Sequence, residues 1–564
     1  MSDSIRRSAG LVLATAIGLL AGHPAAAAAA GRGDEGEPIR LTVVGTSDFH
    51  GALEARHAKV VGGRKLGGVA MIAAYLNAVR RDNPGGVIHL DGGDLYQGTL
   101  LSAASEGRAV VDFYNALGVD AVALGNHDFD FGPVGYHSVP EKPDEDPFGV
   151  LKQRIAQAEF PFLSANIIDR ETGKPPDWPG LKTNSLLERK GLKIGVVGLT
   201  SVDTALTTHP ANMRGLEFRP LLVSLKRVLP AVRRAGADLT LLVIHAGVTV
   251  DERSGKVGGP VAELLRALEP GTVDLVVGGH SHMPFCGVVA GVPVLQSWPN
   301  GLSFTRVELF VDPDSRRVMP ERTVIHGNTF YHRCCRGGQP IQFLGTRLQP
   351  DKRFGRKLEV FRRAVAHLQR IRLGRSLRDL SNRTDLDSPV GNLVTDAMRA
   401  ADSEIEIAMY NSGGLRTSIP KGEVTFGLIY EVVPFDNSLV KVTLSGSQIR
   451  EVVEHGLSAP YGVMEISGLE VEIDPDRDPG QRCRSIRTED GPLQSDRLYV
   501  VGTNEFLLNG GDGYFTFARG RDVEHTHTLI RELVARYIKQ RGTVAPDMGG
   551  RYRPAKTKGE SQDL

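Results

Sequence analysis

Residues 38 to about 310 alternate short β-rich runs with helical stretches, and this alternation restricts the fold more than any other feature of the sequence. The runs include GVIHLDGGD, AVALGNHD, LKIGVVGLTS, LTLLVIHAG and DLVVGGHSH, and stretches such as GGVAMIAAYLNAVRR lie between such runs. Short runs rich in β-branched residues indicate strands, whereas apolar residues three and four positions apart indicate helices. The alternation therefore predicts a layered α/β domain.

Five strand-like runs end in side chains that can bind metal ions. Asp48 and His50 stand two positions apart in TSDFH, and His280 and His282 have the same spacing in GGHSH. Alternate side chains of a strand share a face, so residues at this spacing can converge on one ion, and the ends of adjacent strands can surround one crevice. A lone histidine such as His245 is more often a packed core residue, but packing alone explains the ordered set poorly, because buried polar groups need partners. We predict a metal site formed by Asp48, His50, Asp91, Asn126, His245, His280 and His282.

The N-terminus has the pattern of an export signal. Residues 1–30 contain two arginines, a short apolar stretch and a run of alanines suited to a signal peptidase. We predict a cleaved signal peptide and a periplasmic or secreted mature protein without stable membrane insertion. An uncleaved anchor is the alternative, although the apolar part is short and no stop-transfer cluster of charges follows it.

Composition argues against two other classes of protein. The 564 residues include 67 Lys and Arg against 66 Asp and Glu, so net charge gives no reason to expect binding of a nucleic acid polymer. With 41% hydrophobic and 24% charged residues, the chain has the composition of a soluble globular protein rather than a polytopic membrane protein. Four cysteines, of which Cys334 and Cys335 are adjacent, leave disulfide pairing open. The oligomeric state is open as well.

The length is too great for one hydrophobic core, and the pattern divides the chain into two domains. We expect a first domain at residues 38–325 and an interdomain helix at residues 349–374, where apolar residues recur at helical spacing. The basic residues of this helix are expected to form a solvated face. A second unit is expected at residues 375–545, in which SPVGNLVTDAMRAA is typical of a helix and EIEIAMYNSGG, LVKVTLSG and RLYVVGTNEF are typical of strands.

The order of the candidate metal residues resembles that of metallophosphoesterases. It runs Asp-x-His, Asp, Gly-Asn-His-Asp, His and Gly-His-Ser-His. In the second half, YNSGGLR, VVPFDNSLV and TNEFLLNGGDGY resemble the bacterial 5'-nucleotidase family, which includes UDP-sugar hydrolases and 2',3'-cyclic phosphodiesterases. The resemblance covers about residues 38–525. It implies an α/β fold with an N-terminal layered α/β/β/α metallophosphoesterase sandwich and a second α/β C-terminal nucleotide-binding domain.

The resemblance also implies two divalent metal ions. Two ions about 4 Å apart can activate a bridging hydroxide for attack on phosphorus and compensate the charge of the phosphoryl oxygens. Asp, Asn and His donors suit Mn, Zn, Co or Fe and do not distinguish among them. By resemblance, Asp91 bridges the ions, Asp48, His50 and His282 complete one site, and Asn126, His245 and His280 complete the other.

His127 and Asp130 resemble the catalytic dyad of the family. In the family, the aspartate orients the histidine, which stabilises the transition state or helps to protonate the leaving group. A helix cap is the alternative role for Asp130. Asp128 is expected to be a hydrogen-bonding residue of the turn.

The substrate-binding residues implied by the resemblance lie in the second half. The planar guanidinium of Arg416 suits a phosphate, Phe435 and Phe506 match the aromatics that stack on the base, and Asp512 matches the acid that receives ribose hydroxyls. The chain departs from the family before GNL, where LSNRTDLDSP offers an arginine in an uncertain register and more acidic residues, so the preferred substrate could differ from a simple 5'-monophosphate. The candidate set is Arg383, Asn411, Arg416, Phe435, Phe506 and Asp512.

The leading hypothesis is an exported two-metal phosphohydrolase that releases phosphate from nucleotides. A 2',3'-cyclic-nucleotide phosphodiesterase or a UDP-sugar pyrophosphatase is the alternative within the family. A non-catalytic exported protein that binds nucleotides or metal ions is the alternative from another class, and the intact His127 and metal residues argue against it. A thiosulfohydrolase is a further alternative, which the paired phenylalanines disfavour.

Overall fold

The structure is a computed structural model that covers most of the chain after the predicted signal peptide. It describes residues 36–555 apart from residues 136, 252–253, 334–338, 383–385, 460–461 and 547–549. The predicted signal peptide, Arg383 and the adjacent cysteines lie outside the described residues. Residues Ile39–Leu564 cluster as one compact unit, so the predicted domain boundaries stay a prediction. Within the described ranges, no helix combines the length and apolar character needed to cross a bilayer.

Two β-sheets packed face to face form the centre of the N-terminal part. Over the described residues, the first has seven strands in the order β19-β18-β1-β4-β5-β6-β8, and the second has six in the order β16-β17-β15-β12-β10-β9. The first sheet comprises β19 (Val324–Phe330), β18 (Ser303–Val311), β1 (Ile39–Thr46), β4 (Val87–Asp91), β5 (Ala121–Ala123), β6 (Phe162–Leu163) and β8 (Leu181–Lys182). The second comprises β16 (Phe285–Val289), β17 (Val292–Gln296), β15 (Leu275–Gly278), β12 (Leu239–His245), β10 (Leu192–Thr200) and β9 (Asn184–Arg189).

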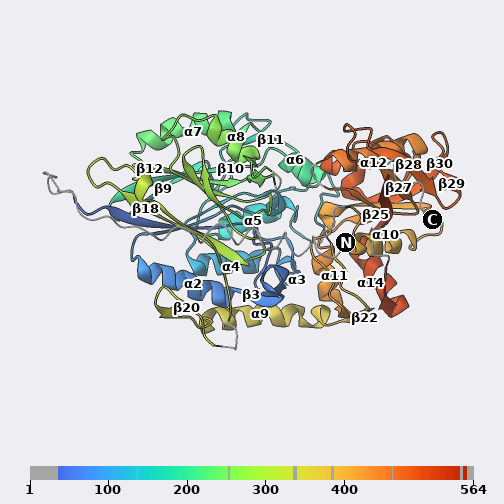
Figure 1. Ribbon diagram of the computed structural model, residues 1–564, viewed down its shortest axis with the longest axis horizontal. Coiled ribbons are helices and arrows are strands. Elements are labelled where there is room, and N and C mark those ends of the chain that lie inside the picture. Colours follow the sequence, from blue (N-terminus) through green and yellow to red (C-terminus); the bar gives the residue numbers. More distant parts are fainter. Residues whose placement is uncertain are drawn as a thin grey trace, which may run out of the picture. The chain divides into compact units, whose positions relative to one another are not determined.

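Helices cover the outer faces of both sheets and complete a four-layered sandwich (Figure 1). In β1, Leu41 and Val43 point into the core between the sheets, whereas Val44 packs beneath the helices. Burial on both faces explains why the strands are almost continuously apolar. The predicted α/β/β/α sandwich is therefore confirmed. The covering helices are α2 (Val69–Asp82) and α4 (Arg108–Leu117) on the first sheet and α7 (Leu221–Arg234) and α8 (Pro260–Arg266) on the second.

A second α/β part follows, which confirms the predicted C-terminal α/β unit. Among the residues described, its largest sheet has the order β26-β23-β30-β25-β31, and two smaller sheets have the orders β24-β22-β32 and β29-β28-β27-β33. The largest sheet comprises β26 (Met464–Ser467), β23 (Ile407–Asn411), β30 (Leu498–Asn504), β25 (Ser438–Ser445) and β31 (Arg521–Leu529). The smaller sheets comprise β24 (Gly422–Thr425), β22 (Arg372–Ser376), β32 (Thr543–Val544), β29 (Gly491–Pro492), β28 (Cys483–Thr488), β27 (Glu470–Ile473) and β33 (Tyr552–Pro554). The helices include α10 (Pro389–Arg399), α11 (Phe426–Val432), α12 (Gly446–Ser458) and α14 (Ile530–Arg541).

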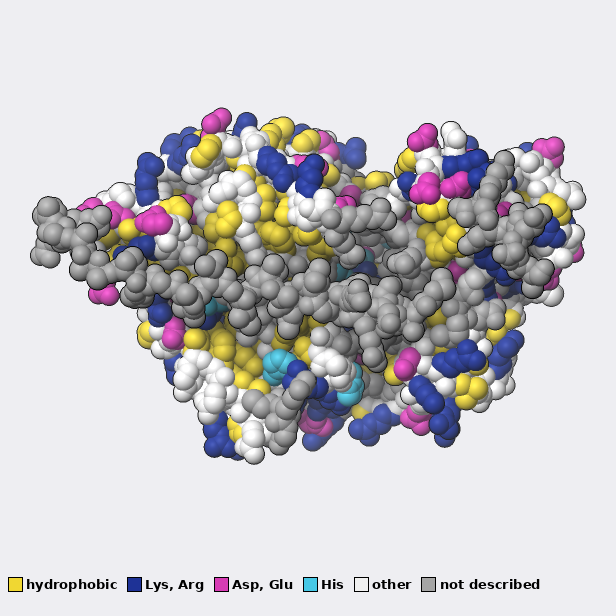
Figure 2. Space-filling model, in the orientation of Figure 1, with side chains coloured by type: hydrophobic (Ala, Val, Ile, Leu, Met, Phe, Trp, Pro, Cys, Tyr) yellow, Lys and Arg dark blue, Asp and Glu magenta, His cyan; other side chains and the backbone are white. Residues whose placement is uncertain are grey.

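The helix α9 (Lys352–Gln369) lies within the predicted interdomain segment. Leu358 and Val365 bury one side of it in the core of the N-terminal part, and it packs against both α2 and α11. Figure 2 shows Lys and Arg side chains interspersed with acidic ones along the edge where Figure 1 places α9. The side chain of Arg363 is 79% exposed, so the basic face of this helix is solvated.

The carboxyl ends of the central strands bring distant parts of the sequence together. β1 runs parallel to β4, with Thr46 opposite Asp91, and β4 runs parallel to β5. In the second sheet, β12 runs parallel to β10 and β15. The segments that follow β1, β4, β5, β12 and β15 carry the polar residues that the sequence singled out, and parallel strands deliver such segments to one crevice.

Candidate active site

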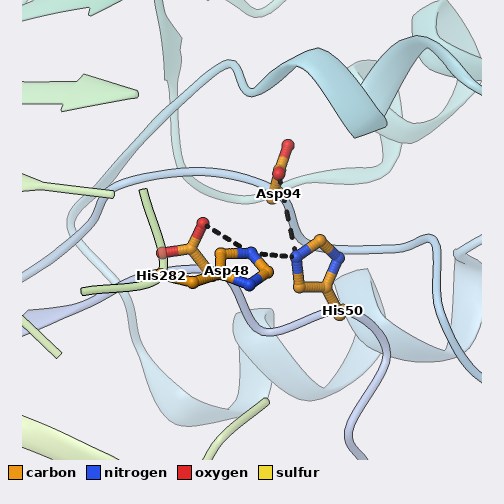
Figure 3. Close-up of side chains that lie close together, drawn as sticks. All are labelled: Asp48, His50, Asp94 and His282. Carbon is orange, nitrogen blue, oxygen red and sulfur yellow. Dashed lines mark hydrogen bonds and ion pairs between the residues drawn. The ribbon is translucent and has the colours of Figure 1, made fainter. Parts of the chain in front are cut away.

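Four side chains from three separate segments form a compact group, which we call the metal cluster. Their ligand atoms lie within 4.8 Å of one another (Figure 3), and three of the four residues are fully buried. The Nε2 atoms of His50 and His282 are 2.9 Å apart, and Asp94 Oδ2 lies 3.8 Å from His50 Nε2. The members of the metal cluster are Asp48, His50, Asp94 and His282.

A second set of donors, which we call the adjoining group, comprises Asn126, His245 and His280. Asn126 Oδ1 lies 3.0 Å from both His245 Nε2 and His280 Nδ1. Asp94 Oδ2 lies 3.2 Å from His245 Nε2, so the carboxylate of Asp94 faces imidazoles of both groups. The structure therefore brings six of the seven predicted metal residues together around Asp94.

The donors have spare capacity for a cation, and their charges depend on one another. Asp48 Oδ2 is buried, and it has no hydrogen-bond partner among the described residues, an arrangement that costs free energy unless a ligand completes it. Burial and the nearby charge of Arg416 hold the pKa of His50 well below its usual value, so the imidazole is neutral. Burial opposes ionisation of Asp94, but the surrounding imidazoles outweigh it and hold its pKa well below the usual value. Divalent metals bind ionised carboxylates and neutral imidazoles. Burial raises the pKa of Asp48, and although burial opposes it, the charge of Asp94 raises the pKa of His245 to about 10. A cation that binds here therefore displaces protons from these two groups.

The prediction for Asp91 needs correction, because its carboxylate lies outside both groups. It accepts hydrogen bonds from Thr46 Oγ1 at 2.6 Å, Tyr114 OH at 3.0 Å and Gly93 N at 2.9 Å. These bonds use its oxygens on the helix-covered side of β4. Gly93, with φ of 93°, then turns the chain so that Asp94 occupies the place expected for Asp91. The motif DGGD contains both aspartates, and only the turn distinguishes them.

Backbone carbonyls orient two of the imidazoles. His245 Nδ1 lies 2.7 Å from Gly92 O, and His50 Nδ1 lies 2.9 Å from Gln97 O. Because a carbonyl can only accept, Nδ1 carries a proton in both rings, so Nε2 is the nitrogen that faces the other donors and can bind a cation when it is unprotonated. The segment after β4 thus supplies Asp94 and orients two imidazoles.

The backbone bends sharply at the metal cluster and at His280 of the adjoining group. Left-handed φ values occur at Asp48 (52°), His50 (50°), Asp94 (61°), His280 (72°) and His282 (54°). Such values are uncommon for residues other than glycine, and they concentrate at functional sites where the surrounding fold imposes them.

Asp203 orients His280 and was not singled out from the sequence. Its Oδ2 lies 3.2 Å from His280 Nε2. Burial alone would raise the pKa of Asp203, but the hydrogen bond to His280 and the charge of that ring bring it to about 2. The residue follows the end of β10, the strand beside β12, and this position was the available signal.

Replacement of Asp203 by asparagine is expected to weaken metal binding by about 10- to 100-fold, because the partner that fixes a metal-binding imidazole is lost. Competition titration with a chelator measures this affinity. Asp169→Asn, at the end of β7 (Ile167–Asp169), is the matched control because its carboxylate accepts hydrogen bonds from the nearby backbone N–H groups of Glu171 and Thr172. Equal affinities in the two variants would contradict the orienting role.

The predicted dyad is assembled. His127 Nδ1 lies 2.7 Å from Asp130 Oδ2, and His127 lines the cleft beside the cluster. Asp128 instead accepts hydrogen bonds from the backbone N–H groups of Leu95 at 2.8 Å and Gly125 at 2.9 Å. Asp128 therefore holds the turn, and the carboxylate of Asp130 is the one that contacts the imidazole.

Five of the six predicted substrate residues lie along the same cleft, whose volume is about 1000 Å³. Arg416 Nη2 donates to His50 Nε2 at 3.2 Å, which places a guanidinium beside the metal cluster. Asn411 Nδ2 donates to Asp512 Oδ2 at 2.9 Å. Phe435 is half-buried with its ring centroid 5.4 Å from that of His127, whereas Phe506 is 8% exposed and also packs in the core of the C-terminal part.

Glu465 is a cleft residue that sequence reasoning missed. It is 1% exposed and accepts hydrogen bonds from Ser388 N at 2.9 Å and Ser388 Oγ at 2.7 Å, at the N-terminus of α10. Burial, aided by the charge of Asp387, raises its pKa from 4.5 to about 7. No local pattern in MEIS marks a buried acid.

Glu465→Gln is expected to remove a pH dependence of stability. Because the folded-state pKa lies above the unfolded value, the protonated acid stabilises the fold below about pH 4.5, and this contribution, about 3 kcal/mol, is lost as pH rises through about 7. Urea unfolding midpoints at about pH 5 and about pH 8 should therefore differ less in the variant than in the wild type. The same pH difference in both proteins would contradict the buried protonated acid.

Comparison with known proteins finds relatives for both parts. The calcineurin-like phosphoesterase family matches residues 41–284, and the family described as 5'-nucleotidase, C-terminal domain, matches residues 364–519. The chain is 28% identical to the 5'-nucleotidase of Bos taurus over 91% of each chain. A 5'-nucleotidase precursor from Thermus thermophilus has a similar structure, with a TM-score of 0.77 and 26% identity over 92% of this chain and 100% of that one. The sulfate thiohydrolase SoxB from Thermus thermophilus shares the fold, with a TM-score of 0.71 and 20% identity over 93% and 98% of the chains.

Proposed function

The chain belongs to the 5'-nucleotidase family of metal-dependent phosphoester hydrolases, and we propose that it releases phosphate from nucleoside 5'-monophosphates. The observation that carries this proposal is a single cleft whose lining includes three members of the metal cluster together with Phe435 and Phe506. The metal donors suit a phosphoryl group, and the two rings suit a nucleobase.

Two divalent metal ions are the cofactors of this family, and the donors of this chain fit them. The metal cluster would hold one ion and the adjoining group the other, with Asp94 shared between them. Bound ions of this kind activate water and compensate charge on phosphoryl oxygens. Carboxylate, amide and imidazole donors suit Mn, Zn, Co or Fe.

The protein supplies further groups for the phosphoryl transfer. His127, held by Asp130, can donate a hydrogen bond or a proton from Nε2, because Nδ1 is engaged. Arg416 reaches the metal cluster with a guanidinium suited to phosphoryl oxygens. These groups lie where charge develops on the phosphoryl group, and donors already positioned there stabilise that charge.

Cleft residues of the C-terminal part would bind the nucleoside. Asp512 accepts a hydrogen bond from Asn411, and its remaining acceptor capacity suits ribose hydroxyls. A volume of about 1000 Å³ exceeds the need of a mononucleotide, so 2',3'-cyclic nucleotides and UDP-sugars stay the alternative substrates. Export through residues 1–30 is part of the same proposal, and N-terminal sequencing of the mature protein tests it.

A substrate panel tests the proposal. The chain without residues 1–30 is stripped with a chelator, restored with Mn, Zn or Co, and assayed for phosphate release from AMP, UMP, 3'-AMP, 2',3'-cyclic AMP and UDP-glucose. Metal-dependent release confined to 5'-monophosphates is the expected result. Turnover of only the cyclic or sugar nucleotides would select an alternative substrate class, and no turnover of any substrate would favour the non-catalytic binding protein.

A further inference from the structure

The first turn of α14 holds the loop that carries Phe435. Arg531, the second residue of α14, is 8% exposed. Burying a guanidinium costs free energy unless its donors are satisfied. Its partners therefore indicate what this residue does.

All the described polar partners of the Arg531 guanidinium lie in the segment 434–436. Nη1 donates to Phe435 O at 3.2 Å and to Pro434 O at 3.4 Å, and Nη2 forms an ion pair with Asp436. The guanidinium carbon also lies 4.5 Å from the ring centroid of Tyr430, on α11. One buried side chain thus satisfies two carbonyls and a carboxylate of consecutive residues.

Backbone hydrogen bonds fix both ends of the same loop. Ile530 N donates to Asn437 O at 3.0 Å, and Arg416 N donates to Val432 O at 2.9 Å. The loop is therefore bound to α14 at one end and to the turn that carries Arg416 at the other. Between these ties, the ring of Phe435 lies 5.9 Å from the guanidinium carbon of Arg416 and 5.4 Å from the centroid of the His127 ring.

We propose that Arg531 is a positioning residue that pre-organises Phe435 for the nucleobase and thereby sets selectivity for nucleotides over phosphate esters that lack a base. The inference rests on the proposed nucleotide function of the cleft. An aromatic ring held in its binding geometry loses less conformational entropy on binding. Lysine at position 531 retains the charge but cannot reproduce the forked donors that reach three acceptors.

The test compares Arg531→Lys with Arg541→Lys. Arg541 lies on the same helix, is exposed, and packs its guanidinium 4.3 Å from the ring centroid of Tyr537, so it controls for loss of an arginine–aromatic contact. The substrates are AMP and ribose 5-phosphate, which has the sugar and phosphate but no base. We expect KM for AMP to rise about 10-fold in Arg531→Lys, with kcat and the hydrolysis of ribose 5-phosphate changed less than about 2-fold.

Equal losses on both substrates, or no change in KM for AMP relative to Arg541→Lys, would overturn the inference. If Arg531→Lys does not fold, Asp436→Asn removes the ion pair from the loop side, and the same selective rise in KM is expected. Calorimetric binding of adenosine to the metal-free protein separates the inference from the proposed function, because it needs no turnover. Absence of nucleotide hydrolysis in the wild type would refute the function, whereas adenosine binding that is equal in the wild type and Arg531→Lys would refute the role of Arg531.

Discussion

Asp94→Ala is expected to lower kcat/KM for AMP by about 1,000-fold or more and to reduce the metal content of the protein below that of the wild type. The carboxylate of Asp94 faces His50 in the metal cluster and His245 in the adjoining group. Its other oxygen accepts a hydrogen bond from His127 N at 2.9 Å. One truncation therefore removes the donor shared by both groups and a contact that places the dyad. Elemental analysis and steady-state kinetics on the same preparations measure the two effects.

Asp91→Asn is the matched control, because it alters the neighbouring aspartate of the same motif. We expect its metal content to match the wild type and its kcat/KM to fall less than about 10-fold, with a loss of about 1–3 kcal/mol in stability, since a buried hydrogen bond from Thr46 or Tyr114 loses its charged acceptor. A variant at Asp91 that lost its metal while Asp94→Ala kept it would reverse the assignment and restore the one expected from sequence.

The contrast between these two aspartates shows where sequence reasoning stops. The layers and strands were predictable because Leu41, Val43 and Val44 belong to a short apolar run, which is typical of a strand buried on both faces. The convergence of His245 with Asp48 was predictable too, since ends of parallel strands share an edge. The choice between Asp91 and Asp94 depended on one left-handed glycine, and nothing in the spacing of DGGD specifies that turn.

Residues that act through tertiary contacts were even harder to predict from the sequence. Arg531 lies 95 to 97 positions from its partners in the loop of Phe435. No sequence pattern around an arginine at the start of a helix predicts such a contact. Asp203 and Glu465 are likewise isolated acids whose partners, His280 and Ser388, become neighbours only after folding. Sequence patterns identify groups that recur with a period or a motif, and these residues belong to neither class.

His127→Gln is expected to lower kcat for AMP by about 100- to 10,000-fold while the metal content stays that of the wild type. The imidazole contributes to the reaction through Nε2, because Nδ1 is bound to Asp130 at 2.7 Å, and His127 is not one of the four members of the metal cluster. Glutamine retains a hydrogen-bonding side chain without an imidazole proton. Stopped assays of AMP turnover with parallel elemental analysis measure the effect, and loss of bound metal together with activity would contradict a role separate from the metal groups.

The leaving group distinguishes the two roles open to His127. If the imidazole protonates the departing ribose oxygen, a substrate with an acidic leaving group, such as p-nitrophenyl phosphate, needs that proton less. His127→Gln should then lower the hydrolysis rate of this substrate far less than that of AMP. If the imidazole stabilises charge on the phosphoryl oxygens, the hydrolysis rates of both substrates should fall by similar factors, because both substrates have those oxygens. Asp130→Asn should follow the same pattern with a smaller loss, since the ring remains but its orientation is less fixed. If Asp130→Asn lowers kcat for AMP more than His127→Gln does, then Asp130 acts on the substrate itself and not through the histidine.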